Sequence, residues 1–124
     1  MGREASTVVL VADDESVVRS LARSVLIREG YNVLEAVDGE HALEVSRGYQ
    51  GSIDVLLTDV KMPRLDGLKL SAQLLLERPG IKILVMSGKL SSELLVIEKK
   101  MHFLRKPFLP EALREKLNLV LRPE

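Results

Sequence analysis

Acidic, hydroxyl and basic side chains follow the apolar runs of this sequence at the points where the runs end. They are Asp13, Asp14, Asp59, Ser87 and Lys106. If the runs are neighbouring strands, the three carboxylates converge, and at about 4 Å and an effective dielectric of about 20 each pair repels by roughly 4 kcal/mol. Lys106 can supply one positive charge, and Mg²⁺ can supply two more because it binds carboxylate and phosphate oxygens while keeping several waters. These residue types therefore favour a magnesium site.

Each of these residues taken alone has a plainer interpretation. Asp13 and Asp14 could merely cap the helix that follows them, because acidic residues favour helix N-termini. Asp59 could be a turn residue, and Lys106 could be a solvated surface lysine. Helix capping would explain only the acids that follow the first run. It does not explain why Asp59, Ser87 and Lys106 end three other runs, so the joint placement of all these residues favours a shared site.

Five apolar, β-rich runs alternate with helix-like segments along the chain. The expected strands are Val8–Ala12, Asn32–Ala36, Ile53–Thr58, Ile81–Met86 and Met101–Arg105. The expected helices are Ser16–Glu29, Glu40–Arg47, Leu68–Glu77, Ser92–Lys100 and one that begins at Pro110 and turns Leu113, Leu117, Val120 and Leu121 inward. This alternation requires right-handed crossovers, and it predicts a doubly wound α/β fold with a parallel sheet. Such sheets bind ligands beyond the carboxyl ends of their strands.

The composition predicts one module of 124 residues, because 46% hydrophobic residues in this length suffice for one compact domain and not for two. Basic and acidic residues number 18 each, so the zero net charge argues against direct nucleic-acid binding. The apolar runs are too short for membrane insertion. With no cysteine, and with residues 1–7 resembling a flexible lead-in rather than a signal peptide, we expect a cytoplasmic protein.

Four motifs, in order and each at a strand end, resemble the receiver domain of bacterial two-component response regulators. They are VLVADDE at 9–15, LLTDVKMPRLDG at 56–67, VMSG at 85–88 and FLRKPF at 103–108. The resemblance covers nearly the whole chain, and it implies a single receiver domain over residues 1–124. It also implies a flavodoxin-like (βα)5 fold with strand order 2-1-3-4-5.

By this resemblance, Asp59 is the phosphoacceptor and Asp14 is a direct Mg²⁺ ligand. Asp13 would orient a metal-bound water, and the backbone carbonyl of Lys61 would be a further ligand. Mn²⁺ could substitute for Mg²⁺. Lys106 would neutralise charge on the transferring phosphoryl group, and the domain would be no enzyme beyond catalysing its own phosphorylation and dephosphorylation.

The resemblance further implies a signalling switch that receives its phosphoryl group from a histidine kinase or a histidine phosphotransfer domain. The Ser87 hydroxyl would contact the phosphoryl group, and Phe103 would turn inward behind it. The output surface would comprise the Ser92–Lys100 helix, the last strand and the last helix. That surface would engage a downstream protein or output domain, or a second copy in a phosphorylation-linked homodimer.

Some features depart from the family pattern or leave alternatives open. The stretch from Ser87 to Lys106 is about one helical turn shorter than usual, so we expect the Ser92–Lys100 helix to be short, reoriented or partly unwound. Lys61 and Lys89 occupy positions that tune dephosphorylation in the family, and we expect their charge to alter it. The sequence does not distinguish a cis from a trans Lys106–Pro107 bond.

Three other functions are weighed against a phosphorylated receiver. A haloacid dehalogenase-type phosphatase also uses an aspartyl phosphate, but its motif requires an acid where Lys61 stands. A flavodoxin-like electron carrier requires a hydroxyl-rich phosphate loop and flanking aromatics, whereas this chain has 3% aromatics. A pseudo-receiver that acts without phosphorylation is disfavoured by the intact acidic set. The chain could be a stand-alone regulator or a receiver from a longer protein, such as a hybrid histidine kinase.

Overall fold

The computed structural model describes residues 7–88 and 101–122, which contain one five-stranded parallel sheet. Its strands are β1 (Val8–Ala12), β2 (Asn32–Ala36), β3 (Val55–Asp59), β4 (Lys82–Ser87) and β5 (Met101–Arg105). They lie in the order β2-β1-β3-β4-β5, which confirms the expected flavodoxin-like topology. The chain crosses from one side of β1 to the other after β2, so the carboxyl ends of β1 and β3 lie side by side.

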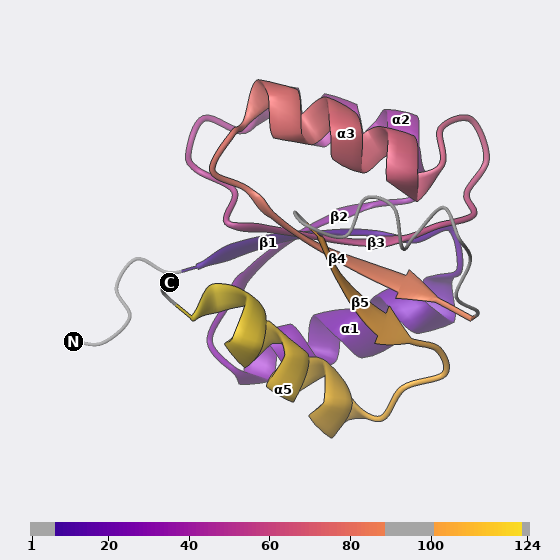
Figure 1. The fold of residues 1–124 in the computed structure, drawn as a ribbon, viewed down its shortest axis with the longest axis vertical. Coiled ribbons are helices and arrows are strands. Elements are labelled where there is room, and N and C mark those ends of the chain that lie inside the picture. Colours follow the sequence, from indigo (N-terminus) through magenta and orange to yellow (C-terminus); the bar gives the residue numbers. More distant parts are fainter. Residues whose placement is uncertain (1–6, 89–100, 123–124) are drawn as a thin grey trace.

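Helices cover both faces of the sheet. They are α1 (Ser16–Arg28), α2 (Gly39–Gly48), α3 (Gly67–Glu77) and α5 (Pro110–Leu121). Figure 1 shows α2 and α3 on one face and α1 and α5 on the other. The expected helix at Ser92–Lys100 lies outside the described residues. In the described part of the chain, no helix combines the length and the apolar character needed to cross a membrane.

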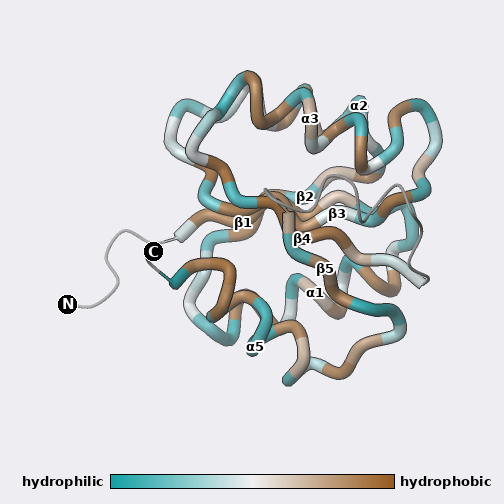
Figure 2. The backbone as a smooth tube through the Cα atoms, viewed as in Figure 1, coloured by the Kyte–Doolittle hydropathy of each residue, from teal (hydrophilic) through white to brown (hydrophobic). Residues whose placement is uncertain are grey.

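The central strands are apolar on both sides, as expected for strands buried between two helical layers. Alternate residues of each strand enter different cores, because successive side chains of a strand point to opposite faces. Leu10 and Leu56 pack in the core beneath α2 and α3, whereas Val11 and Leu57 pack in the core beneath α1 and α5. Figure 2 shows the resulting apolar band through the sheet. Burial at this band holds the strand ends in register.

Two predicted strands differ from the observed ones at their ends. The strand expected at Ile53–Thr58 runs instead from Val55 to Asp59, and the one expected at Ile81–Met86 runs from Lys82 to Ser87. Both continue one residue further because Asp59 still pairs with Met86, and Ser87 still pairs with Arg105. The polar residues therefore lie within the ladder rather than in the loops, and the strands restrict their backbones.

Helix boundaries follow local chemistry closely. Gly30 adopts a φ of 91° just after α1, which explains why that helix ends one residue earlier than the expected Glu29. The side chain of Asp38 caps α2, and that of Asp66 caps α3, so these two helices begin one residue earlier than expected. In α5 the expected inward residues Leu113, Leu117 and Val120 are buried, and Leu121 is half-buried.

Candidate acidic site at the carboxyl ends of the strands

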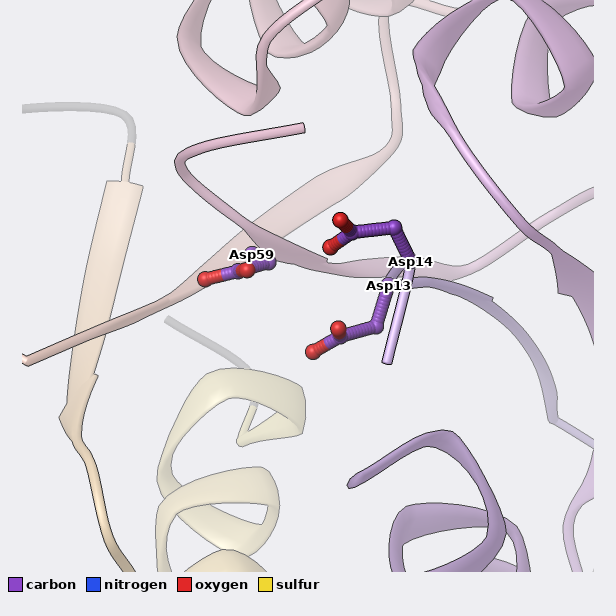
Figure 3. Close-up of side chains that lie close together, drawn as sticks. All are labelled: Asp13, Asp14 and Asp59. Atoms are coloured by element: carbon purple, nitrogen blue, oxygen red, sulfur yellow. The ribbon is translucent and has the colours of Figure 1, made fainter. Parts of the chain in front are cut away.

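The parallel sheet brings three carboxylates together at one edge. Asp13 and Asp14 follow β1 directly, and Asp59 is the last residue of the neighbouring strand β3. One oxygen from each of the three side chains lies within 4.8 Å of the other two. Figure 3 shows the three side chains gathered where the two strands end. The expected convergence of these acids is therefore present in the structure.

Lys106 reaches this cluster from the far side of β4. Its Nζ atom lies 3.3 Å from Oδ1 of Asp59, 3.5 Å from Oδ2 of Asp13 and 3.7 Å from Oε1 of Glu15. The Lys106 amide donates a hydrogen bond to the carbonyl of Ser87 at 2.8 Å, which ties the end of β5 to the end of β4. The Lys106–Pro107 bond, which the sequence left open, is cis. One ammonium group is thus shared by three carboxylates.

Asp13 is completely buried, and its two oxygens have different surroundings. Oδ1 accepts a hydrogen bond from the Glu15 amide at 2.8 Å. Oδ2 has no hydrogen-bond donor within the described part of the chain. The N-cap of α1 is Glu15, without a side-chain cap, so the alternative that Asp13 and Asp14 cap this helix is wrong. A buried carboxylate oxygen left in this state is suited to a cation or a cation-bound water.

Burial shapes the charges of the cluster. It raises the pKa of Asp13 more than the Glu15 amide and Lys106 lower it, and the neighbouring Asp59 raises it further. Burial likewise raises the pKa of Asp59, against the opposing effect of Lys106. For Lys106, burial alone would lower the pKa, but the nearby Asp13 and Asp59 raise it. The site therefore holds more negative charge than its one lysine compensates.

The backbone around Asp59 is closely packed. The Val60 amide donates to Oδ1 of Asp59 at 3.0 Å, and the Thr58 hydroxyl donates to the Asp59 carbonyl at 2.9 Å. Gly67, the first residue of α3, lies so close to this carbonyl that a Cβ atom at Gly67 would overlap it. Glycine is needed here for close approach, and it lets α3 fix the end of β3.

The donor set fits a hard divalent cation. The clustered side chains offer carboxylate oxygens, one of them a buried oxygen without a hydrogen-bond donor in residues 7–88 and 101–122. Mg²⁺ and Mn²⁺ both accept such oxygen donors. Lys61 follows Asp59 by two residues, and its side chain is exposed. Its carbonyl belongs to the loop that leaves the site.

Two of the other expected site residues lie on the neighbouring strands β4 and β5. Ser87 is half-buried at the end of β4, the strand between Asp59 and Lys106. Phe103 is half-buried in β5 and packs against the core beneath α2 and α3. Lys89 lies outside the described residues. The structure therefore places the hydroxyl on the strand next to β3 and the aromatic one strand further, on β5.

Sequence reasoning missed several supporting contacts. Nη1 of Arg19, in α1, donates a hydrogen bond to the Asp13 carbonyl at 2.8 Å. Nε of the same arginine lies 3.4 Å from Oε1 of Glu35, in β2. Arg64 forms an ion pair with Asp38 beside the loop that follows Asp59. Asp13 and Arg19 are six residues apart in the sequence, which offers a weak local signal for this contact. The Arg64–Asp38 pair joins segments that are distant in the sequence, so no local sequence signal predicts it.

The family model of the response regulator receiver domain matches residues 9–118. The chain belongs to this family. The receiver domain is 37% identical over 106 residues to the sensor kinase CckA of Brucella abortus, covering 83% of this chain and 11% of that protein. It is 36% identical over 121 residues to the chemotaxis protein CheY1 of Helicobacter pylori, covering 91% of this chain and 95% of that protein. The solved chemotaxis protein CheY4 of Vibrio cholerae matches with a TM-score of 0.84 and 29% identity, covering 94% and 100% of the two chains.

These comparisons confirm the resemblance drawn from the four motifs. The chain spans between 11% and 48% of the first four curated relatives that it matches. Receiver domains are signalling domains of two-component systems rather than classical enzymes, and the family binds Mg²⁺ through an acidic cluster. The coarse function of this chain is therefore that of a CheY-like receiver domain.

Proposed function

We propose that this receiver domain accepts a phosphoryl group on Asp59 from a histidine kinase or a histidine phosphotransfer domain. The observation that carries the proposal is the position of Lys106 Nζ, 3.3 Å from Asp59 and 3.5 Å from Asp13. A structural lysine would need one acidic partner, whereas this one lies within a cluster of acids that it cannot neutralise alone. The cluster therefore suits a bound divalent cation together with a phosphoryl group.

The transfer is a substitution at phosphorus. A carboxylate oxygen of Asp59 forms the new O–P bond, and the P–N bond to the donor histidine breaks. The leaving imidazole nitrogen keeps the electron pair of that bond and takes a proton from solvent. Lys106 remains protonated, because its pKa is raised, and its ammonium stabilises the negative charge on the phosphoryl oxygens.

Asp14, Asp59 and the Lys61 carbonyl would hold Mg²⁺, with Asp13 acting through water. When bound, the ion supplies positive charge that offsets both the carboxylates and the phosphoryl oxygens. Asp13 contributes the buried Oδ2 atom, which has no hydrogen-bond donor within the described residues. Mn²⁺ is expected to replace Mg²⁺ because it accepts the same oxygen ligands.

Phosphorylation would then be sensed by Ser87 and Phe103. The phosphoryl group adds about −1.5 to −2 charges at one position, and the Ser87 hydroxyl can donate to one of its oxygens. Phe103 lies on the adjacent strand and would turn inward as Ser87 moves. Shifting a switch from 1:99 to 99:1 requires about 5.5 kcal/mol, which several charge-assisted contacts of roughly 1.5–3 kcal/mol each could supply.

The output surface would include β5, α5 and the segment between β4 and β5. A downstream protein, an output domain or a second copy of this chain would bind there after phosphorylation. The bacterial cytoplasm is the expected compartment, since phosphohistidine donors of two-component systems act there. The chain would work alone or within a longer protein such as a hybrid histidine kinase.

Mass spectrometry of the protein incubated with acetyl phosphate and Mg²⁺ tests this proposal. We expect one phosphoryl adduct on the wild type, none on Asp59→Asn, and none when EDTA removes the metal. Asp54→Asn is a matched control, because Asp54 lies beside the opposite end of β3 and its variant should be phosphorylated normally. An unmodified wild type, or an adduct retained in Asp59→Asn, would contradict the proposal and favour a pseudo-receiver.

A further inference from the structure

An ion pair joins the loop that follows β3 to the start of α2. Nε and Nη2 of Arg64 donate hydrogen bonds to Oδ2 of Asp38 at 2.9 Å and 2.6 Å. Asp38 is only 3% exposed, and its Oδ1 atom caps α2 by accepting the His41 amide at 2.8 Å. The Arg64 side chain is 59% exposed, but that of Asp38 is largely buried, so loss of Arg64 would remove both hydrogen-bond donors from a largely buried carboxylate oxygen. We call the Arg64–Asp38 pair the clasp.

The loop is docked on α2 by its backbone as well. Arg64 has a φ of 70°, in the left-handed region that residues with long side chains rarely adopt. The carbonyl oxygen of the next residue, Leu65, lies where a Cβ atom at Gly39 would be. The clasp and this close approach both involve residues 38–39. The middle of the loop is therefore held against the start of α2.

The same loop carries the backbone groups next to the proposed phosphoacceptor. The Val60 amide donates to Oδ1 of Asp59 at 3.0 Å, and the Val60 carbonyl accepts the Gly67 amide at 2.8 Å. Lys61 lies between Val60 and Arg64 in the chain. β3 and α3 hold the two ends of the loop, and its middle is held by the clasp, by the buried Met62 side chain and by the close approach of Leu65 to Gly39. Arg64 lies three residues after Lys61, so the clasp acts on the same short stretch of backbone.

We propose that Arg64 is a positioning residue for the acidic site. Through the clasp it keeps the Val60 amide against Asp59. It also keeps the Lys61 carbonyl in the orientation in which it would bind Mg²⁺. The role of the metal in this inference rests on the proposed function. Arg64 touches no reacting group, since its guanidinium bonds to Asp38 on the side of α2.

Two variants remove the clasp from either side. Arg64→Asn suits the backbone, because asparagine adopts left-handed conformations more readily than most residues. Asp38→Asn removes the charge while an asparagine still caps α2. Arg47→Gln is the matched control, because Nε and Nη2 of Arg47 donate to Glu77 at 3.1 Å and 2.6 Å in a comparable pair between α2 and α3.

Amide hydrogen exchange without metal tests the clasp independently of phosphorylation. In Arg64→Asn and Asp38→Asn, we expect the amides of Val60 and Gly67 to exchange about tenfold faster than in the wild type. Arg47→Gln should leave both rates unchanged. Equal rates in the wild type and Arg64→Asn would overturn the inference that the clasp orders this loop.

Magnesium titration followed by amide chemical shifts tests the consequence for the site. We expect the dissociation constant to rise about tenfold in both clasp variants, as is typical when an outer contact that orients a ligand is lost. The double variant should bind no more weakly than either single variant, because one interaction has been removed. Phosphorylation by acetyl phosphate should recover in the variants at saturating Mg²⁺, which a general loss of folding would not allow.

The outcomes separate this inference from the proposed function. If the wild type binds Mg²⁺ and is phosphorylated on Asp59, and Arg64→Asn matches it in affinity, the positioning role is wrong and the proposed function stands. If the wild type binds Mg²⁺ but is not phosphorylated on Asp59, the proposed function is wrong, whereas weaker Mg²⁺ binding by Arg64→Asn would still support the positioning role.

Discussion

The ammonium nitrogen of Lys106 lies 3.3 Å from Oδ1 of Asp59, so a side chain that follows the edge strand β5 reaches past β4 to the end of β3. The same nitrogen lies 3.5 Å from Oδ2 of Asp13. Asp14 adds a third carboxylate within 4.8 Å of the other two. Because one lysine cannot neutralise this cluster, the stability of the domain should depend on divalent cations and on pH.

Removing one carboxylate should stabilise the domain when no metal is bound. Burial raises the pKa of Asp59, which means that its ionised form is disfavoured in the folded state. We expect Asp59→Asn to raise the free energy of unfolding in EDTA by about 1 kcal/mol, the typical size of a single-substitution effect. Urea denaturation measures this difference.

The effect of added Mg²⁺ provides the control. A ligand that binds only the native state stabilises it by mass action, so the wild type should gain stability with Mg²⁺ and Asp59→Asn should gain less. Destabilisation of Asp59→Asn in EDTA, or an equal response of both proteins to Mg²⁺, would contradict the charge-repulsion argument.

The pH dependence should have opposite signs in two ranges. The pKa values of Asp13 and Asp59 are raised from 3.8, mainly by burial, so the folded protein binds these protons more tightly than the unfolded chain. Without metal, the free energy of unfolding should therefore increase as the pH falls from neutral through these raised values. In Asp59→Asn the increase should be smaller.

At lower pH the trend should reverse. Arg47 and Gln73 donate hydrogen bonds that lower the pKa of Glu77 from 4.5 to about 2, and the His41 amide and Arg64 lower that of Asp38. Their contribution to stability is present above the ordinary carboxyl pKa and is lost as the pH falls through the lowered values. Urea denaturation in EDTA across this range should show a maximum, and a steady decline from neutral pH downward would be inconsistent with it.

Gly67→Ala should disturb the site through the backbone. The added Cβ atom would overlap the Asp59 carbonyl, so β3 or α3 must move. We expect a loss of about 2 kcal/mol in the free energy of unfolding and slower phosphorylation by acetyl phosphate. Gly48, the last residue of α2, has no positive φ, and an added Cβ atom meets nothing within 4 Å, so Gly48→Ala should be stabilised by about 0.4–1 kcal/mol and phosphorylated normally. Similar behaviour of the two variants would argue against the close approach.

Arg78 should matter for stability and not for chemistry. It lies between α3 and the amino end of β4, away from the acidic site, and its guanidinium donates to Ser46, Tyr49 and Gly51. Arg78→Ala should cost about 2 kcal/mol in thermal or urea unfolding, because several buried or half-buried acceptors lose a charged donor. Its phosphorylation rate at a temperature where it remains folded should equal that of the wild type. Arg28→Ala, at an exposed position of α1, serves as the control.

Lys61 should influence the lifetime of the phosphoryl group. Its side chain is exposed two residues after Asp59, where a positive charge can act on an attacking water or on the acyl phosphate. We expect Lys61→Ala to change the rate of autodephosphorylation, followed by loss of the adduct in mass spectra, and the same is expected of Lys89→Ala. Lys69→Ala, another exposed lysine, should leave the rate unaltered. An unchanged lifetime of the phosphoryl group in Lys61→Ala and Lys89→Ala would contradict this prediction.

The amino-acid sequence by itself determined the elements of this domain and the residue types at the strand ends. Runs such as Val8–Ala12 are apolar without a break, and Gly30 ends α1, because burial and backbone conformation leave local patterns. Those patterns place Asp13 and Asp59 at strand ends. The family motifs then indicated the strand order that the structure confirms.

Only the tertiary structure decided how these residues meet. The reach of Lys106 across β4 and the buried Oδ2 of Asp13 depend on sheet order and packing. The clasp of Arg64 on Asp38 joins two loops that are distant in the sequence. Such contacts depend on distances between segments far apart in the chain, and hydrophobic periodicity carries no record of them. The physical reason is that secondary structure follows from local backbone and burial preferences, whereas charge pairing follows from the three-dimensional arrangement of the strands.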